Sequence, residues 1–155
     1  MKKIIGLCII FGVIVVTVWQ RANHEEPMHA EDYLQLGIEH GVAGKHEDAI
    51  EAFKKAIQKN PNYPSAYLSL GNAYGNTGRY KKSIAAYKEG IQIDPRHSQV
   101  PQMEMNIAWI ANKMNDKKTA VLYSQKAIQS FTDRNNLAGV TQAASQLMMI
   151  QKNTP

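Results

Sequence analysis

Two stretches of the chain carry the same pattern and decide its fold. Residues 33–61 read YLQLGIEHGVAGKHEDAIEAFKKAIQKNP, and residues 67–95 read YLSLGNAYGNTGRYKKSIAAYKEGIQIDP. The two stretches are offset by 34 residues, and ten or more positions hold the same residue in both. Self-similarity at a fixed period of this length indicates a structure that is built from stacked supersecondary units.

The residue types predict that each unit is a pair of packed helices. A leucine fills the space between the helices, a glycine lets them approach closely, and an alanine and an aromatic residue on the second helix fit against them. A further glycine turns the chain between the helices, and the final proline ends the second helix because it lacks an N–H donor. The residues that we expect to define the repeats are Leu36, Gly37, Ala49, Phe53, Pro61, Leu70, Gly71, Tyr87 and Pro95.

This pattern resembles the tetratricopeptide repeat (TPR), in which W-x2-L-G-x2-Y is followed by A-x3-F and then by proline. The resemblance implies an all-α, TPR-type α-solenoid of helix-turn-helix repeats. Residues 30–63 match as a first repeat and residues 64–97 as a second.

A third, degenerate repeat is expected over residues 98–132. If its preceding loop holds three extra residues, Ile107 and Ala108 take the leucine and glycine places, and Ser124 replaces the aromatic residue. Residues 133–155 are expected to form a capping helix and tail, because a solenoid needs a helix to cover its last apolar face. The apolar residues that fall there at helical spacing are Leu137, Val140, Ala144, Leu147 and Met148.

The first 22 residues differ in character from the rest. Lys2 and Lys3 precede an apolar run without charge, residues 4–19, and residues 23–29 read as a short polar linker. A membrane-spanning helix needs about 20 residues, with about 17 as the lower limit. No small-x-small cleavage site follows the run, so we favour an uncleaved N-terminal transmembrane helix over a cleaved signal peptide.

The flanking charges indicate an orientation. Lys2 and Lys3 favour a cytoplasmic N-terminus, and Arg21 partly offsets them. The expected location is therefore the cytoplasmic membrane of a bacterial cell, crossed once, with the C-terminal domain on the periplasmic or cell-surface side.

Composition argues against several other classes of protein. The net charge is +5, but basic and acidic residues are interspersed, whereas nucleic-acid binding needs clustered Lys and Arg. The only cysteine is Cys8, so no intrachain disulfide can form. The sequence holds no nucleotide-binding loop, nucleophile elbow or zinc-ligand spacing, and we predict no enzymatic activity, no cofactor and no metal site.

By resemblance, the first helix of each repeat lines a groove that receives a peptide or a helix of a partner protein. Asparagine side chains can bond both the N–H and the C=O of a bound backbone, and Trp is enriched at interface hot spots. The expected groove residues are Leu34, Ile38, Val42, Leu68, Asn72, Asn76, Met105, Trp109, Asn112 and Lys113.

The same residues can instead have a purely structural role. Leu34, Leu68 and Met105 can equally pack between neighbouring helices, and the capping helix can shield Trp109. One variant of the family binds chain-terminal carboxylates through Lys, Asn and Arg. The matching positions here lack those positive charges, which argues against that mode; they are Leu34, Ile38, Ser69, Gln102 and Asn106.

The leading hypothesis is thus a membrane-tethered adaptor that binds a protein or peptide partner for assembly of an envelope complex. The alternative is a structural module that associates with itself as a homo-oligomer. A helical-repeat RNA binder is a third hypothesis, against which the 34-residue period and the absence of a basic groove both argue.

Overall fold

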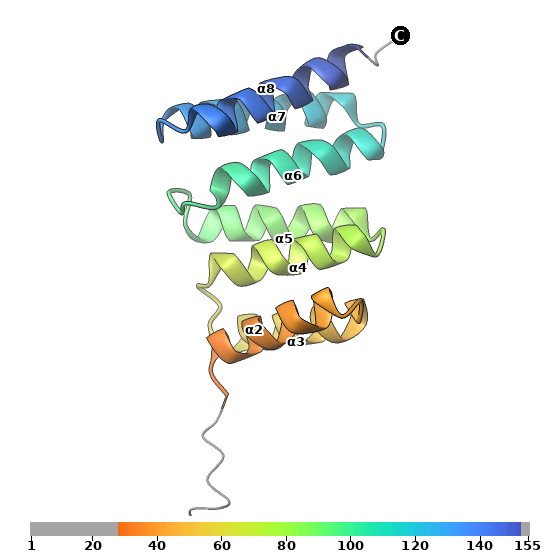
Figure 1. The fold of residues 1–155 in the computed structure, drawn as a ribbon, viewed down its shortest axis with the longest axis vertical. Helices are drawn as coiled ribbons and strands as arrows, with labels where there is room; N and C mark the ends of the chain where they lie inside the picture. The colour runs from red at the N-terminus through yellow and green to blue at the C-terminus, as the bar shows by residue number, and fades with distance from the viewer. Residues whose placement is uncertain (1–27, 153–155) are drawn as a thin grey trace, which may run out of the picture.

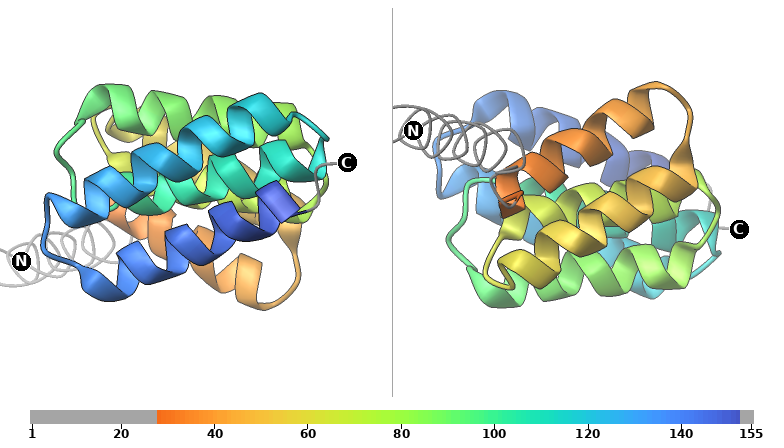
Figure 2. Two further views of the ribbon diagram at one scale, coloured as in Figure 1. Left: turned by 90° about the horizontal axis from the view of Figure 1, so that it is seen from above. Right: turned by 90° about the horizontal axis from the view of Figure 1, so that it is seen from below.

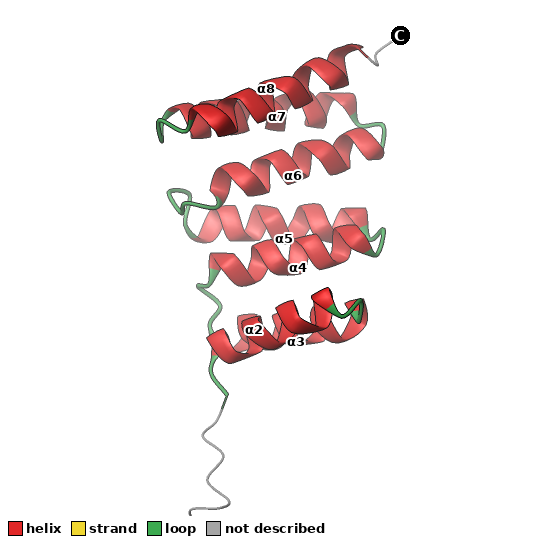
Figure 3. Cartoon of the chain, viewed as in Figure 1, coloured by secondary structure: helices red, strands yellow, loops and turns green. Residues whose placement is uncertain are grey.

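A computed structural model describes residues 28–152 of the chain, and this part is entirely helical outside its turns and loops (Figure 3). The helices stack one above another, with α2 and α3 at one end and α8 at the other (Figure 1). Seen along the stack, they overlie one another (Figure 2). The seven helices of the described residues are α2 (Ala30–Val42), α3 (His46–Lys59), α4 (Pro64–Asn76), α5 (Tyr80–Ile93), α6 (Val100–Lys113), α7 (Lys117–Thr132) and α8 (Leu137–Lys152).

One turn geometry recurs four times, after α2, α4, α6 and α7. Each turn has a residue with positive φ, namely Gly44 and Gly78 at 73°, Asn115 at 62° and Asn135 at 53°. The next residue donates its N–H to the carbonyl five positions back, as from Arg79 to Tyr74 at 2.8 Å. This is the Schellman end of a helix, which glycine makes most easily and asparagine tolerates.

Glycine and an aromatic ring meet inside each of the first two helix pairs. Gly37 lies against Phe53, and Gly71 lies against Tyr87. A Cβ atom on either glycine would stand 2.6 Å from the Cδ1 atom of the opposing ring. The predicted close approach of the paired helices is therefore present, and no side chain fits at either glycine.

Most of the repeat-defining residues lie where the pattern predicts. Ala49, Phe53, Leu70 and Tyr87 are buried, and both prolines follow the ends of α3 and α5. Leu36 is only half-buried, so it contributes less to the interhelical space than expected. Its repeat is the first of the stack, and no preceding pair covers it within the described residues.

The third pair, α6 and α7, replaces the ring-on-glycine contact by two small residues. Ala108 and Ser124 occupy the matching register, and both are fully buried. The turn residue Asn115 stands 37 residues after Gly78, in agreement with three additional residues in the loop before α6. A methyl group on one helix is thus accommodated because the ring on the other is absent.

The ring-on-glycine contact returns between α7 and α8. A Cβ atom on Gly139 would lie 2.5 Å from Cγ of Phe131. Gly139, Ala143 and Ile150 form the buried face of α8. The apolar residues expected there were partly wrong, because Leu137 is 80% and Met148 is 69% exposed. Small residues take their place since α8 must approach the Phe131 ring closely.

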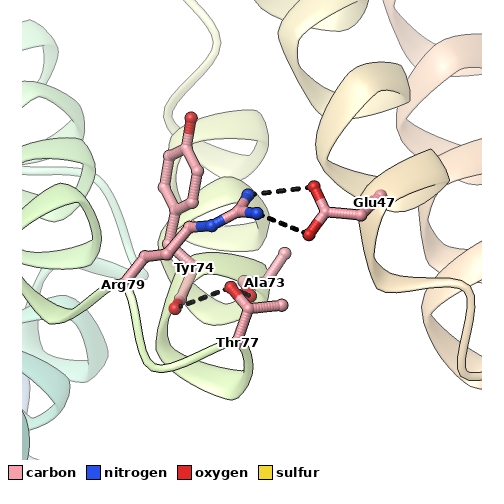
Figure 4. A network of polar contacts seen from close by, with 5 residues as sticks. All are labelled: Glu47, Ala73, Tyr74, Thr77 and Arg79. Atoms are coloured by element: carbon pink, nitrogen blue, oxygen red, sulfur yellow. Dashed lines mark hydrogen bonds and ion pairs between the residues drawn. The ribbon is translucent and has the colours of Figure 1, made fainter.

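The first two pairs are joined by an ion pair (Figure 4). Arg79 donates to both carboxylate oxygens of Glu47, at 2.6 and 3.0 Å. Beside it, the Thr77 hydroxyl donates to the carbonyls of Ala73 and Tyr74 at the end of α4, both at 3.1 Å. Both charged side chains are partly exposed, so the bridge orients the two pairs more than it stabilises them.

No helix within residues 28–152 is long and apolar enough to cross a membrane. The expected anchor, residues 1–22, and the linker up to residue 27 lie outside the described residues.

Glu104 is an ionisable side chain in the core of the third pair. It is 7% exposed, and its Oε2 atom has no hydrogen-bond partner within the described residues. Burial raises the pKa of its carboxyl above the ordinary value of 4.5, and Ser130, Lys126 and Arg134 oppose that shift.

Gly71→Ala should destabilise the fold by about 1–3 kcal/mol, because the added methyl collides with the Tyr87 ring. Gly41→Ala is the matched control, since a Cβ there meets nothing within 4 Å. It should be neutral or stabilising by up to about 1 kcal/mol through helix propensity. Chemical denaturation of both variants measures the difference.

The cost of Gly71→Ala should shrink in a Tyr87→Ser background, which reproduces the Ala108 and Ser124 pairing. A double-mutant cycle gives this coupling directly. Equal costs with and without the ring would contradict the ring-on-glycine account.

Glu104→Gln should raise the melting temperature at neutral pH. Because the folded chain holds the Glu104 proton more tightly than the unfolded chain, wild-type stability is lost as the pH rises from 4.5 through the raised pKa. The glutamine variant lacks this loss, so its advantage should disappear as the pH falls below 4.5. Thermal melts between about pH 4 and pH 8 measure it. A pH-independent difference would mean that Glu104 ionises freely in the folded state.

Candidate partner-binding groove

A groove of about 760 Å³ runs across the faces of α4, α6 and α8. Its lining is a mixture of amide and apolar side chains. The lining residues are Asn72, Gly75, Asn76, Tyr87, Gln102, Met105, Asn106, Trp109, Ile110, Gln142, Ser145, Gln146 and Met149.

A smaller recess of about 170 Å³ continues this groove toward α2. Asn72 and Asn76 line both hollows and so mark their junction. Ile38 lines the recess, where its side chain is 42% exposed. The two hollows together cross the first helix of every pair.

The structure brings together five of the predicted groove residues. Asn72, Asn76, Met105 and Trp109 line the main groove, and Ile38 lines the recess. Met105 is only 7% exposed and belongs mainly to the core that α6 forms with α7 and α8.

Two predicted groove residues belong to the core instead. Leu68 is buried among Tyr87, Met103 and Ile107, and Leu34 is half-buried against the cluster that contains Phe53. The packing interpretation therefore holds for both leucines. Both leucines lie on the side of their helix that packs against neighbouring helices of the stack.

Trp109 is 48% exposed, so the capping helix does not shield it. The ammonium group of Lys113 lies 4.5 Å from the centre of its ring. Asn112 lies outside the groove, where its Oδ1 atom accepts a 2.8 Å hydrogen bond from Lys117. Val42 also lies outside and is 86% exposed.

A hydrogen-bonded chain of side chains orients the amides on the groove floor. The Tyr87 hydroxyl donates to Oδ1 of Asn72 at 2.7 Å, and Nδ2 of Asn106 donates to the same oxygen at 3.0 Å. Gln102 donates in turn to Oδ1 of Asn106 at 3.0 Å. Burial raises the pKa of Tyr87, so its hydroxyl stays protonated and remains a donor at neutral pH.

The Nδ2 group of Asn72, which lines the groove, is left without a partner as a result. Its oxygen already accepts two hydrogen bonds, whereas its nitrogen donates to no other group in residues 28–152. The Asn76 side chain, one turn further along α4, has no hydrogen-bonding partner in the described chain either. Both amides can therefore bond a ligand.

Sequence reasoning missed the contribution of α8. This helix was expected only to cover the last apolar face, but Gln142, Ser145, Gln146 and Met149 form one side of the groove. Gln146 also donates to the carbonyl of Met105 at 3.1 Å, which ties α8 to α6. The run of polar residues on α8 was the available signal. Gln102 and Asn106 were considered only as positions that lack a positive charge.

The groove presents amide and apolar side chains. None of its lining side chains is charged, and the recess adds only His46. Within residues 28–152, no group of three His, Cys, Asp or Glu side chains is placed to hold a metal ion.

Known proteins share the repeat and the fold. A family model described as TPR repeat matches residues 43–78, and one described as tetratricopeptide repeat matches residues 64–97. No curated protein matches the sequence significantly.

Three solved structures illustrate the similarity of fold. The TPR2B domain of yeast Sti1, in a complex with pHsp70, has a TM-score of 0.74 at 16% identity, covering 81% of this chain and 98% of the other. PcrH, known from Pseudomonas aeruginosa, is solved with the chaperone binding region of PopD. It has a TM-score of 0.72 at 20% identity, with 79% and 90% covered. The first TPR of Spaghetti (RPAP3), bound to the HSP90 peptide SRMEEVD, has a TM-score of 0.69 at 14% identity, with 84% and 96% covered.

At these identities the likeness concerns the fold alone, while the two family matches concern the repeats themselves. Residues 43–97 therefore carry tetratricopeptide repeats, and the described residues form an all-α TPR-like solenoid of seven helices.

Proposed function

We propose that this protein is a membrane-tethered adaptor that binds a segment of a partner protein in the groove between α4, α6 and α8. The observation that carries the proposal is that the Asn76 amide and the Nδ2 group of Asn72, neither of them hydrogen-bonded within the described residues, line the same groove as the exposed ring of Trp109. Amides can hold a polypeptide backbone, and the ring supplies apolar area that a ligand can cover.

The fold neighbours support a binding role. The yeast Sti1 domain is solved in a complex with pHsp70, PcrH with the chaperone binding region of PopD, and the Spaghetti domain with an HSP90 peptide. A groove of amides and apolar side chains without a catalytic constellation suits the same kind of task here.

The tether is proposed from the sequence of residues 1–22. Lys2 and Lys3 followed by the apolar residues 4–19 suit a single membrane-spanning helix with its N-terminus in the cytoplasm. The repeat domain would then lie on the outer side of the cytoplasmic membrane, where it can recruit components of an envelope complex.

The tether predicts that the protein stays in the membrane fraction after carbonate and high-salt washing, with its N-terminus intact. Fractionation with N-terminal peptide mass spectrometry checks this. A soluble mature chain that begins near Asn23 would show that residues 1–22 are a cleaved signal instead.

The groove predicts that Asn76→Ala with Trp109→Ala weakens partner binding on the order of 100-fold. A hot-spot Trp contributes about 2 kcal/mol and an amide contact about 1 kcal/mol, and each 1.4 kcal/mol is about tenfold. Asn72 is left unchanged because its Oδ1 atom accepts a hydrogen bond from the Tyr87 hydroxyl, and removing the Asn72 side chain would disturb the fold. Partners captured by cross-linking to the full chain supply the ligand for titration.

Leu122→Ala is the matched control. The exposed fraction of Leu122, 46%, is similar to the 48% of Trp109, but Leu122 lies on α7 outside the groove. It should leave the affinity unchanged. If the double variant stays folded and binds within threefold of wild type, the partner uses another face.

A further inference from the structure

The groove carries enough detail to specify the chemistry of its ligand. Building on the proposed function, we infer that the groove takes an extended, uncharged segment from the interior of the partner chain, and not an acidic chain end. Three properties of the lining support this inference: its unpaired amides, its lack of charge and the position of its apolar residues.

The unpaired amides favour an extended ligand. Asn72, Asn76 and Gln142 line the groove, and the Asn76 and Gln142 amides and the Nδ2 group of Asn72 have no hydrogen-bonding partner among residues 28–152. The backbone N–H and C=O groups of a helix are bonded within the helix, so they offer nothing to these amides. An extended segment leaves its backbone groups free, and each must find a partner when it is buried.

The lack of charge in the lining argues against an acidic chain end. A buried carboxylate needs a cation or several donors to replace its hydration. No Lys or Arg lines the groove. Lys113 holds its ammonium 4.5 Å from the centre of the Trp109 ring, and Lys117 donates a hydrogen bond to Asn112. A neutral peptide backbone makes no such demand, and the amides match both its donors and its acceptors.

The apolar residues predict a pattern of ligand side chains. Trp109 from α6 and Met149 from α8 are 48% and 61% exposed, and both line the groove. Successive side chains of an extended segment point to opposite sides. Apolar side chains at alternate positions of the ligand would therefore face this wall while the backbone meets the amides.

Two random-peptide display libraries test the inference with the full chain in detergent micelles. One library presents each peptide inside a carrier loop, and the other presents it with a free C-terminal carboxylate. Selected peptides are resynthesised with blocked or free ends and titrated against wild type, Trp109→Ala, Asn76→Lys and the control Leu122→Ala.

The inference predicts binders from the loop library that lack Asp and Glu and carry apolar residues at alternate positions. Their affinity should fall tenfold or more in Trp109→Ala, stay unchanged in Leu122→Ala, and vary less than about twofold between low and high salt. Asn76→Lys should gain binding of acidic peptides, because it adds the missing cation.

The other outcomes separate the inference from the proposed function. Groove-dependent binders that require a free carboxylate or acidic residues would overturn the inference and leave the groove as the binding site. Binders that become helical when bound would also overturn it. Recovery only of binders that Trp109→Ala does not affect, or of none, would overturn the proposed function together with the inference.

Discussion

The contact between an aromatic ring and a helical glycine sets the geometry of this molecule. At Gly71 the ring of Tyr87 occupies the space of a side chain, so α4 and α5 approach each other closely. The same tyrosine reaches through to the groove, where its hydroxyl holds the Asn72 amide. A core residue, Tyr87, thus orients a side chain of the candidate binding surface, Asn72. A substitution of Tyr87 would therefore affect both the core and the groove.

The other helix interfaces show what this constraint allows. Where the ring is absent, as at Ser124, the opposing helix carries a methyl group at Ala108. At the end of the stack, Phe131 and Gly139 form the same kind of contact, but here the ring lies on the earlier helix, α7, and the glycine on the later one, α8. Close packing leaves few combinations of volume that fill such a space, so one large and one very small residue, or two small ones, recur.

The fold could be predicted largely because its signal is local and repeated. The period of 34 residues, the glycines at Gly44 and Gly78 and the terminal prolines each specify a helix end or a turn without reference to distant residues. The burial of Leu68 and the exposure of Leu137 and Met148 depend on how neighbouring helices are rotated, which hydrophobicity alone does not show. The buried face of α8 was missed in part because two of its members, Gly139 and Ala143, are small residues that pack against the Phe131 ring.

The candidate site was predicted in part for the same reason. Asn72, Asn76 and Trp109 occupy repeat positions whose direction follows from the fold. The contribution of α8 has no counterpart in the repeat, since this helix stands alone after the third pair. Its glutamines read as ordinary solvent-exposed residues until the structure places them opposite α4.

The order of elements along the chain also determines how tension would pass through a tethered molecule. The N-terminal segment joins the stack at α2, while the groove lies on α4, α6 and α8. A pull between membrane and bound partner would therefore run through the first helix pair. That pair is linked to the next by apolar packing and by the exposed Arg79–Glu47 bridge, whose strength depends on ionic conditions. The Arg79–Glu47 bridge would thus bear part of any load on a tethered chain, and a larger part at low salt than at high salt.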